Sequence, residues 1–546
     1  MSQKGETIMW TEEQIRAGIE ELTLDELVGQ LLCYETGSFS VEQYEEIVKK
    51  TKPGSVYLHR ATAERTEGLL AAHKKYCQVP TMIVADVEEG VNNLCDGVEF
   101  PSMMGCSATD DASLMKRAYH ATAQAERKAG VSLALSPVVD INYNTKSSVL
   151  NVRAASDSPD QVIKMGKAML EGLQQDGLMA ACCKHFPGDG MDDRNQHFMT
   201  TINSLSREEW MNTYGRVYRE MIKAGTMAIM VAHIALPAFD EKIDDIMGYP
   251  PATLSTNLMT GLLKGELGFD GCIVSDALSM VGACAMAPAE RLAVEYLKAG
   301  GDMLLFPLPT DFDYIKAALE SGELPMERVK DAVTRIWRLK NSVGLLDEAD
   351  APTEEQLIPE TPIEEIAQEL ADKSLKVVRD VDGLIAGKGL KAGAKVLHVI
   401  AKPENRHSKS TALPVVEEEF KKRGIEVTTL TNPGHNEVKA AMEDCDYVLL
   451  SIACDTHNNG GGTLRIGWEQ AMIMWRAYIL QHPRLIVASL GDPYKLYDYP
   501  YVKTYVNCYS KAPSSQRALV KLLTGEIEAV GKSPVELKGF FERETI

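Results

Sequence analysis

Two groups of polar residues stand close together in the first half of the sequence. The first is Lys-His-Phe-Pro-Gly-Asp-Gly at residues 184–190, and the second is Asn195, Gln196 and His197. Both follow a short apolar run, residues 178–183, of the kind that forms a buried strand. Because a strand interior would leave so many polar groups without partners, we expect the strand to end there and lead into a catalytic loop. A simpler alternative is a Pro-Gly turn that only ends the strand.

Ionisable residues recur at the same position along the chain. Each follows an apolar run, and together they are Asp86, Asp140, Lys184 with His185, His233 and Asp276. One such aspartate could simply cap the next helix. Five positions in register favour a shared active site over five separate helix caps. The carboxyl ends of parallel barrel strands meet at one face, where the following loops build the active site. We therefore predict that these side chains share one site.

The segments between these residues alternate in a way that predicts the fold. Helical periodicity marks residues 112–128, 159–175, 207–223 and 288–298. Between and around them lie eight apolar runs, at residues 30–34, 54–58, 81–85, 131–139, 178–183, 227–232, 271–275 and 302–306. This alternation predicts a (β/α)8 TIM-like barrel over residues 1–345, with a doubly wound sheet as the structural alternative.

A second α/β unit is expected after the barrel. Residues 346–380 are acidic and contain proline, and we interpret them as a linker and connecting helix. Residues 381–546 then predict a C-terminal α/β sandwich, a parallel sheet with helices on both faces, because the apolar runs at 395–401, 426–431, 447–453, 485–489 and 504–507 are nearly continuous. Helices are expected at residues 413–422, 437–442, 468–480 and 514–523. The glycine-rich loop 455–462 lacks known phosphate-binding patterns, so it is either a solvated loop or a segment that reaches the substrate.

Composition excludes several classes of partner. The chain has 57 Lys and Arg against 78 Asp and Glu, a formal net charge of −21, which disfavours nucleic acid and anionic membrane surfaces. The sequence contains no run long and apolar enough to span a membrane, and residues 1–11 lack a signal-peptide core, so we expect a cytoplasmic protein. The eleven cysteines show no zinc-ribbon or Cys-x-x-Cys spacing. The oligomeric state stays open.

Carboxylates at strand ends favour acid–base or covalent carboxylate chemistry over transition-metal chemistry. A magnesium site built from Asp86, Asp140 and Asp276 is conceivable, but it would normally accompany a phosphate-binding loop, and the sequence shows none clearly. We therefore predict no metal and no cofactor.

Two motifs resemble the signature blocks of glycoside hydrolase family 3. They are the 184–190 segment and Gly-Phe-Asp-Gly-Cys-Ile-Val-Ser-Asp-Ala-Leu-Ser-Met at 268–280, supported by shorter matches at 85–90, 100–102, 136–140 and 151–153. Within the family, the chain is most similar to β-N-acetylglucosaminidases (β-N-acetylhexosaminidases). Those enzymes carry their acid/base in an Asp-Ser-His block on the loop after the fifth strand.

The resemblance implies a role for each matching residue. Asp276 corresponds to a nucleophile that forms a covalent glycosyl-enzyme, which water then releases with retention. The residues matching sugar-hydroxyl binders are Asp86, Arg153, Lys184 and His185, whose charged groups suit a polyol. His233 either lines the same pocket or is a core histidine bonded to the backbone.

His197 matches the acid/base, and here the sequence departs from the family pattern. The family has Asp two residues earlier, whereas this chain has Asn195. Asparagine can accept a hydrogen bond from the imidazole but offers no negative charge to stabilise the imidazolium. The same change in the serine-protease triad costs about 10⁴ in turnover. We hypothesise that Asp192 or Asp193 on the same loop supplies the missing charge.

Four functions remain open from the sequence. The preferred one is an exo-acting retaining β-N-acetylhexosaminidase that takes small saccharides or cell-wall fragments. A phosphorylase is the second, because a histidine without a neighbouring carboxylate would repel phosphate less. The third is a β-glucosidase of the same fold that draws its acid from the C-terminal domain. The fourth, suggested by Asn195, is a sugar-binding protein without turnover, and an intact Asp276 argues against it.

Overall fold

The computed structural model describes residues 9–546 except 59–62, 95, 348, 350, 387–388, 403–411, 455–470 and 476–477. The chain divides into two compact units. The first comprises Met1–Gly97, Met115–Asp140 and Gly166–Glu360, and the second comprises Val98–Leu114, Ile141–Met165 and Thr361–Ile546. The predicted loop at 455–462 lies outside the described residues, as do residues 468–470 and 476–477 of the predicted helix at 468–480.

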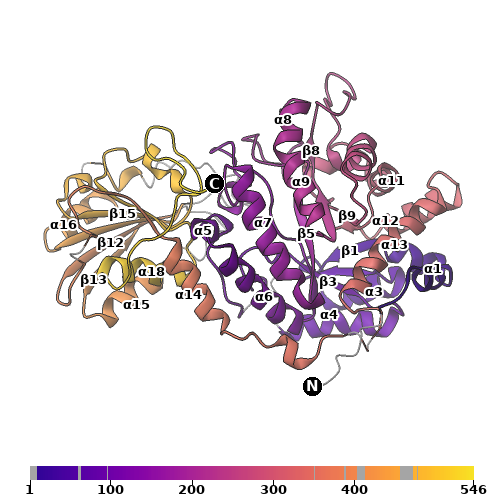
Figure 1. The fold of residues 1–546 in the computed structure, drawn as a ribbon, viewed down its shortest axis with the longest axis horizontal. Helices are drawn as coiled ribbons and strands as arrows, with labels where there is room; N and C mark the ends of the chain where they lie inside the picture. The colour runs from indigo at the N-terminus through magenta and orange to yellow at the C-terminus, as the bar shows by residue number, and fades with distance from the viewer. Residues whose placement is uncertain are drawn as a thin grey trace. The chain divides into compact units, whose positions relative to one another are not determined.

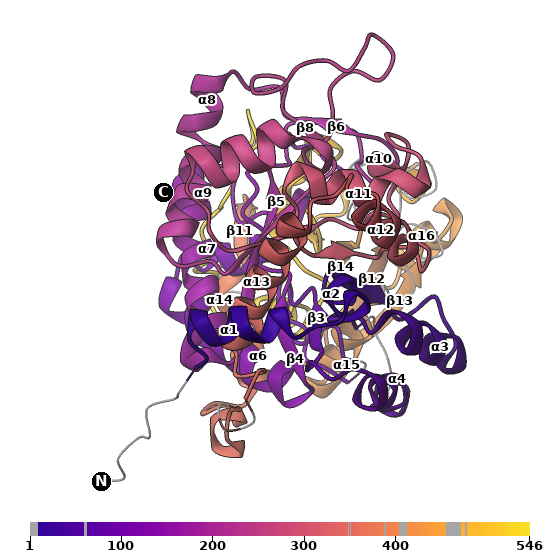
Figure 2. The ribbon, with the colours of Figure 1, turned by 90° about the vertical axis from the view of Figure 1, so that its right-hand side faces the viewer.

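An eight-stranded parallel sheet forms the centre of the first unit (Figures 1 and 2). Its order is β10-β1-β2-β3-β4-β5-β7-β9, and an isolated parallel bridge connects Val274 of β9 with Met303, the residue before β10. The sheet is therefore a nearly closed barrel, which confirms the predicted TIM-like fold. Its strands are β1 (Leu32–Glu35), β2 (Ser55–Tyr57), β3 (Met82–Ala85), β4 (Val131–Ala134), β5 (Ala180–Phe186), β7 (Ala228–Val231), β9 (Cys272–Ser275) and β10 (Leu304–Leu305).

Helices separate these strands along the chain. The longer ones are α1 (Glu12–Glu20), α3 (Val41–Thr51), α4 (Ala63–Tyr76), α6 (Ala112–Lys128), α7 (Pro159–Gln174), α9 (Tyr214–Lys223), α11 (Ala289–Ala299), α12 (Asp311–Glu320) and α13 (Met326–Ser342). The helix expected over 207–223 is broken: α8 (Arg207–Asn212) ends at Thr213, whose φ of −117° and ψ of −94° are not helical. A two-stranded parallel sheet of β6 (Thr201–Ile202) and β8 (Ile234–Ala235) lies after β5 and β7 in the chain.

Strand β5 extends further than its sequence suggested. Lys184 and His185 lie inside the strand, at its carboxyl end, and not in the loop that follows it. The expectation of an earlier end was wrong because both side chains have partners from distant segments. Lys184 pairs with Asp86, and His185 pairs with Asp140.

The second unit is built around a six-stranded sheet of order β11-β16-β15-β14-β12-β13. Five strands are parallel, as expected: β12 (Lys395–Ala401), β13 (Glu426–Thr431), β14 (Tyr447–Ile452), β15 (Leu485–Ser489) and β16 (Thr504–Asn507). The sixth, β11 (Lys376–Asp380), pairs antiparallel with β16 at the edge. Alternate residues of β12 enter separate apolar clusters: Val396 and Ile400 pack with α15 (Pro414–Lys422) and α18 (Pro513–Thr524), and Leu397 and Val399 with α16 (His435–Met442).

The second unit also includes segments that come early in the chain. Ser102, just before α5 (Met103–Ala108), donates a hydrogen bond to the Tyr509 carbonyl, and Ser156 donates one to the Pro534 carbonyl. Lys532 pairs with Asp110 at 2.6 Å. These long-range contacts explain why residues 98–114 and 141–165 group with the C-terminal segment. The interval 346–380, interpreted from sequence as a linker and connecting helix, contains the helix α14 (Ile363–Ser374) and the strand β11.

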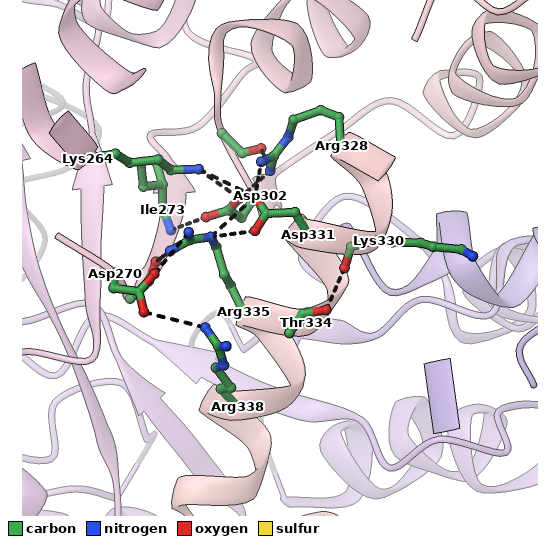
Figure 3. Close-up of polar contacts among 12 residues, drawn as sticks. Lys264, Asp270, Ile273, Asp302, Arg328, Lys330, Asp331, Thr334, Arg335 and Arg338 are labelled. Carbon is green, nitrogen blue, oxygen red and sulfur yellow. Dashed lines mark hydrogen bonds and ion pairs between the residues drawn. The ribbon is translucent and has the colours of Figure 1, made fainter. Parts of the chain in front are cut away.

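A group of charged side chains lies at the amino end of β9 and β10 (Figure 3). At its centre, the fully buried Asp302 accepts a hydrogen bond from the Ile273 N–H at 2.8 Å and pairs with Lys264 and Arg328. Asp331 and Asp270 extend the group through Arg335. Removing one partner of a buried ion pair leaves an uncompensated charge, so Asp302 should matter for stability.

We expect Asp302→Asn to lower the free energy of unfolding by about 3 kcal/mol, because Lys264 and Arg328 would lose their buried counter-ion. The shift can be measured as a lower midpoint for the first transition in urea. Asp270→Asn is the matched control: its side chain is 78% exposed, so the expected loss is below about 1 kcal/mol. Equal losses in the two variants would contradict this assignment.

Among the described residues, no helix combines the length and apolar character needed to cross a bilayer.

Candidate active site

The ammonium group of Lys184 lies between two carboxylates at the carboxyl end of the barrel strands. Its Nζ is 2.8 Å from Asp86 Oδ1 and 2.7 Å from Glu88 Oε1. The Tyr57 hydroxyl donates a second hydrogen bond to Asp86, at 2.7 Å. Lys184 is buried, whereas about half of the Asp86 side chain is exposed. Strands β2, β3 and β5 thus present an oriented carboxylate to solvent, the type of group that accepts hydrogen bonds from a polyol.

His185 is held by Asp140, which follows β4. The buried carboxylate accepts bonds from the His185 N–H and from the Asp189 N–H, the latter at 2.8 Å. Its other oxygen lies 2.7 Å from His185 Nδ1. A carboxylate in that position fixes the proton on Nδ1, so in the neutral ring Nε2 is the acceptor nitrogen. Asp140 thereby sets both the orientation and the tautomer of His185.

The turn after β5 is fixed by helices α8 and α9. The Trp210 indole donates to the Pro187 carbonyl at 2.8 Å, and the Tyr214 hydroxyl donates to the Asp189 carbonyl. Gly188 has a φ of +118°, and a Cβ atom at this position would overlap the Tyr214 ring. Glycine is therefore required here for both conformation and space.

Asp276 directly follows β9 and is partly exposed. Its Oδ1 accepts a hydrogen bond from the Ala277 N–H at 2.8 Å, and the described residues provide no other hydrogen bond to the side chain. Burial by itself raises the pKa of this carboxyl, but the nearby imidazoles, His233 and His185 foremost, together with the Ala277 N–H bond, bring the pKa below its ordinary value. The result is an ionised carboxylate with an oxygen available to a ligand.

His233, after β7, is a fully buried histidine beside this carboxylate. Its Nε2–H donates to the Ala277 carbonyl at 2.9 Å, and its Nδ1 accepts a bond from the Thr253 hydroxyl at 3.0 Å. Burial lowers the pKa of His233, although Asp276 acts in the opposite direction. Both ring nitrogens are engaged by protein groups, and the assignment of His233 as a residue that lines the pocket stays a prediction.

The imidazole of His197 is oriented by Asn195. The Asn195 Oδ1 lies 2.9 Å from the His197 backbone nitrogen and 2.7 Å from its Nδ1. The backbone N–H can only donate, which identifies the acceptor as the amide oxygen and places a proton on Nδ1. Asn195 therefore fixes the tautomer as an aspartate would, without contributing a negative charge. Electrostatic interaction of His197 with Asp276 adds to the lowering of the Asp276 pKa.

Asp192 is committed to partners of its own. It accepts hydrogen bonds from the Arg194 side chain at 2.6 to 3.0 Å and from the Ile202 N–H at 2.9 Å. These bonds lower the pKa of Asp192, although burial opposes the shift. Asp193 is exposed. The hypothesis that Asp192 or Asp193 replaces the missing charge beside His197 stays a prediction.

Arg153 belongs to the second compact unit, at the end of a short 3-10 helix (Asn151–Arg153), and is buried. Its guanidinium donates to the Val149 carbonyl at 3.3 Å. Its assignment as a sugar binder also stays a prediction.

The structure adds residues that the sequence did not single out. Glu88 and Tyr57 complete the surroundings of Lys184 and Asp86, Thr253 fixes a ring nitrogen of His233, and Gln196 contacts the His233 backbone. Glu88 could have been noticed, because it stands two residues after Asp86 in a matched motif. Tyr57 and Thr253 carry no local signal, since each acts on a residue from another strand.

The barrel residues combine an ionised carboxylate with nearby imidazoles and a lysine–carboxylate pair. In the part of the chain that the structure describes, no three His, Cys, Asp or Glu side chains form a group that could hold a metal ion. A carboxylate and an imidazole are the types of group suited to nucleophilic attack and to proton transfer, respectively.

The chain is similar to known proteins along nearly its whole length. The family model described as "Glycosyl hydrolase family 3 N terminal domain" matches residues 23–339, more than half of the chain. A protein from Cellulomonas fimi named β-N-acetylglucosaminidase/β-glucosidase is 30% identical over 542 residues, covering 96% of this chain and 95% of that protein.

Two solved structures are similar over nearly the whole chain. A β-glucoside phosphorylase, BglX, bound to 2FGlc, superposes with a TM-score of 0.86 at 29% identity and covers 96% of each chain. A glycoside hydrolase family 3 β-N-acetylglucosaminidase from Paenibacillus sp. str. FPU-7 superposes with a TM-score of 0.79 at 27% identity, covering 94% of this chain and 99% of that one.

Proposed function

We propose, since this chain belongs to glycosyl hydrolase family 3, that it is a retaining exo-β-N-acetylhexosaminidase acting on terminal β-linked N-acetylglucosamine of small saccharides or cell-wall fragments. The observation that carries this proposal is the environment of the Asp276 carboxylate. This ionised carboxylate ends a barrel strand with one oxygen bonded to the Ala277 N–H and interacts electrostatically with His185, His197 and His233. That is the environment a carboxylate nucleophile needs.

In the first step, Asp276 attacks the anomeric carbon while the bond to the leaving oxygen breaks. His197, protonated on both nitrogens, transfers its Nε2 proton to that oxygen and keeps the Nδ1–H bonded to Asn195. In the second step, the neutral imidazole takes a proton from water as water attacks the anomeric carbon, and the bond from that carbon to the Asp276 oxygen breaks. Two inversions at the same carbon give net retention. Asp86 and Lys184 are the groups assigned to the sugar hydroxyls.

A phosphorylase is the second candidate, and Asn195 favours it. An amide beside His197 stabilises the imidazolium less than a carboxylate would. His197 is therefore a less effective general base for activating water. Inorganic phosphate is already an anionic nucleophile and needs less help from a general base than water does. A neutral amide also repels phosphate less. The name of the similar BglX structure, a β-glucoside phosphorylase, is in line with this alternative.

Three assays test these proposals together. Incubation with a 5-fluoro-β-N-acetylglucosaminyl fluoride, followed by peptide mass spectrometry, should place a covalent sugar on the peptide that contains Asp276. Product analysis in phosphate and in zwitterionic buffer should yield free sugar in both for a hydrolase, and sugar 1-phosphate in phosphate for a phosphorylase. If the neutral amide favours phosphate, Asn195→Asp lowers the ratio of sugar 1-phosphate to free sugar. Aryl glycosides with and without the 2-acetamido group distinguish a β-glucosidase.

A further inference from the structure

Gln196 connects the loop that carries His197 to the end of another barrel strand. The residue is 1% exposed, and its Oε1 accepts a hydrogen bond from the His233 backbone N–H at 3.1 Å. The His233 ring in turn donates to the carbonyl of Ala277, the residue after the nucleophile. A chain of two hydrogen bonds thus runs from the residue before His197 to the residue after Asp276.

The same loop is joined a second time to the segment that follows β9. The Gly282 N–H donates to the Gln196 carbonyl at 3.2 Å, and the Val281 N–H donates to the His197 carbonyl at 3.1 Å. The Thr200 hydroxyl donates to the Gly282 carbonyl at 2.9 Å. Backbone bonds therefore attach Gln196 and His197 to the start of α10 (Val281–Cys284), and the Thr200 side chain adds a third bond.

Gly282 permits this close approach. A Cβ atom added at this position would lie 2.5 Å from the Gln196 carbonyl oxygen and 2.8 Å from the His233 Cβ. The first distance is to backbone, so any side chain here would push the two loops apart. The contact surface thus involves three loops, those after β5, β7 and β9.

We propose that Gln196 and Gly282 are positioning residues that hold the His197 imidazole in place relative to Asp276. Gln196 stands where the Asp-Ser-His block of similar enzymes has serine, whose side chain is shorter by two atoms. The longer amide reaches the His233 backbone and supplies a fixed attachment beside Asn195, on a loop that lacks the charge of the family's aspartate. This inference rests on the proposed role of His197 as acid/base.

Gln196→Met tests the attachment, because methionine keeps the length of the side chain and removes the acceptor oxygen. We expect kcat/KM to fall by up to about 100-fold for methyl or phenyl glycosides, which need a proton on the leaving oxygen. The 2,4-dinitrophenyl glycoside, which needs no such proton, should lose less than about 3-fold. The alkaline limb of the pH–rate profile should shift for phenyl glycosides only.

Gly282→Ala disturbs the same contact from the opposite side and should produce the same dependence on the leaving group. Gln124→Met is the matched control: Gln124 on α6 is also buried and donates to the Gln356 and Ile358 carbonyls, so its loss should affect both substrates equally or not at all. A uniform loss in both Gln196→Met and Gly282→Ala, or no loss, would overturn the positioning role. His197→Ala is the reference: if it shows no leaving-group dependence, the proposed function fails, and if it alone shows one, this inference fails.

Discussion

Replacing Asp276 with alanine should reduce kcat by about 10⁶-fold, the scale found when a catalytic nucleophile is removed. The carboxylate is the only group assigned to form the bond to the anomeric carbon, and water cannot take its place at the same oriented position. The rate of 4-nitrophenol release from the aryl N-acetylglucosaminide measures the effect. Asp270→Asn, an exposed aspartate at the opposite end of β9, should leave the rate within about 2-fold of wild type, since exposed changes of this kind have small effects.

Adding azide to Asp276→Ala tests the assignment more directly, through the configuration of the product. An anion that fills the space of the lost carboxylate attacks the anomeric carbon once, so the product should be the α-glycosyl azide, with inverted configuration. A β-glycosyl azide would contradict the assignment and indicate that an acid/base had been removed. Saccharide binding without any turnover in the wild-type protein would instead favour the sugar-binding alternative.

The pH dependence of the wild-type enzyme should reflect the environment of Asp276. Since neighbouring imidazoles bring its pKa below the ordinary value for aspartate, the carboxylate stays ionised as the pH falls through the range where an ordinary aspartate protonates. The acid limb of kcat/KM should therefore lie below that range.

The barrel could be predicted from the sequence because its strands are buried on both faces and read as short apolar runs separated by helical periodicity. Strand β11 was not predicted, since Lys376 and Arg379 flank its two valines and all five of its residues are only partly buried. An antiparallel edge strand of this kind forms because it pairs with its neighbour β16, and no local sequence pattern predicts that pairing.

The candidate site was predictable in its residue types and less so in its contacts. Asp276 and His233 could be placed at strand ends from position alone. The strand positions of Lys184 and His185 could not, because the groups that stabilise a buried lysine and histidine, Asp86 and Asp140, come from 98 and 45 residues away. Gln196 had no signal of its own, since its partner is a backbone N–H on another strand.

Replacing His197 with alanine should have the second largest effect on the rate. In His197→Ala, we expect kcat/KM for phenyl and methyl glycosides to fall by about 10²- to 10⁴-fold, the usual contribution of a general acid. The dinitrophenyl glycoside should form the glycosyl-enzyme at close to the wild-type rate, because its leaving oxygen needs no proton. Rapid-mixing measurements of dinitrophenol release should show a burst, followed by slow turnover.

The slow phase after the burst tests the role of His197 as the general base of the second step. Without His197, water lacks a general base, and the glycosyl-enzyme should accumulate on Asp276. Azide, or phosphate if the chain is a phosphorylase, is already anionic and should speed its breakdown, and azide should give the β-glycosyl product, opposite in configuration to that of Asp276→Ala. Equal losses for all leaving groups, with no burst, would mean that the bond between Asn195 and His197 only stabilises the loop and that the acid lies elsewhere.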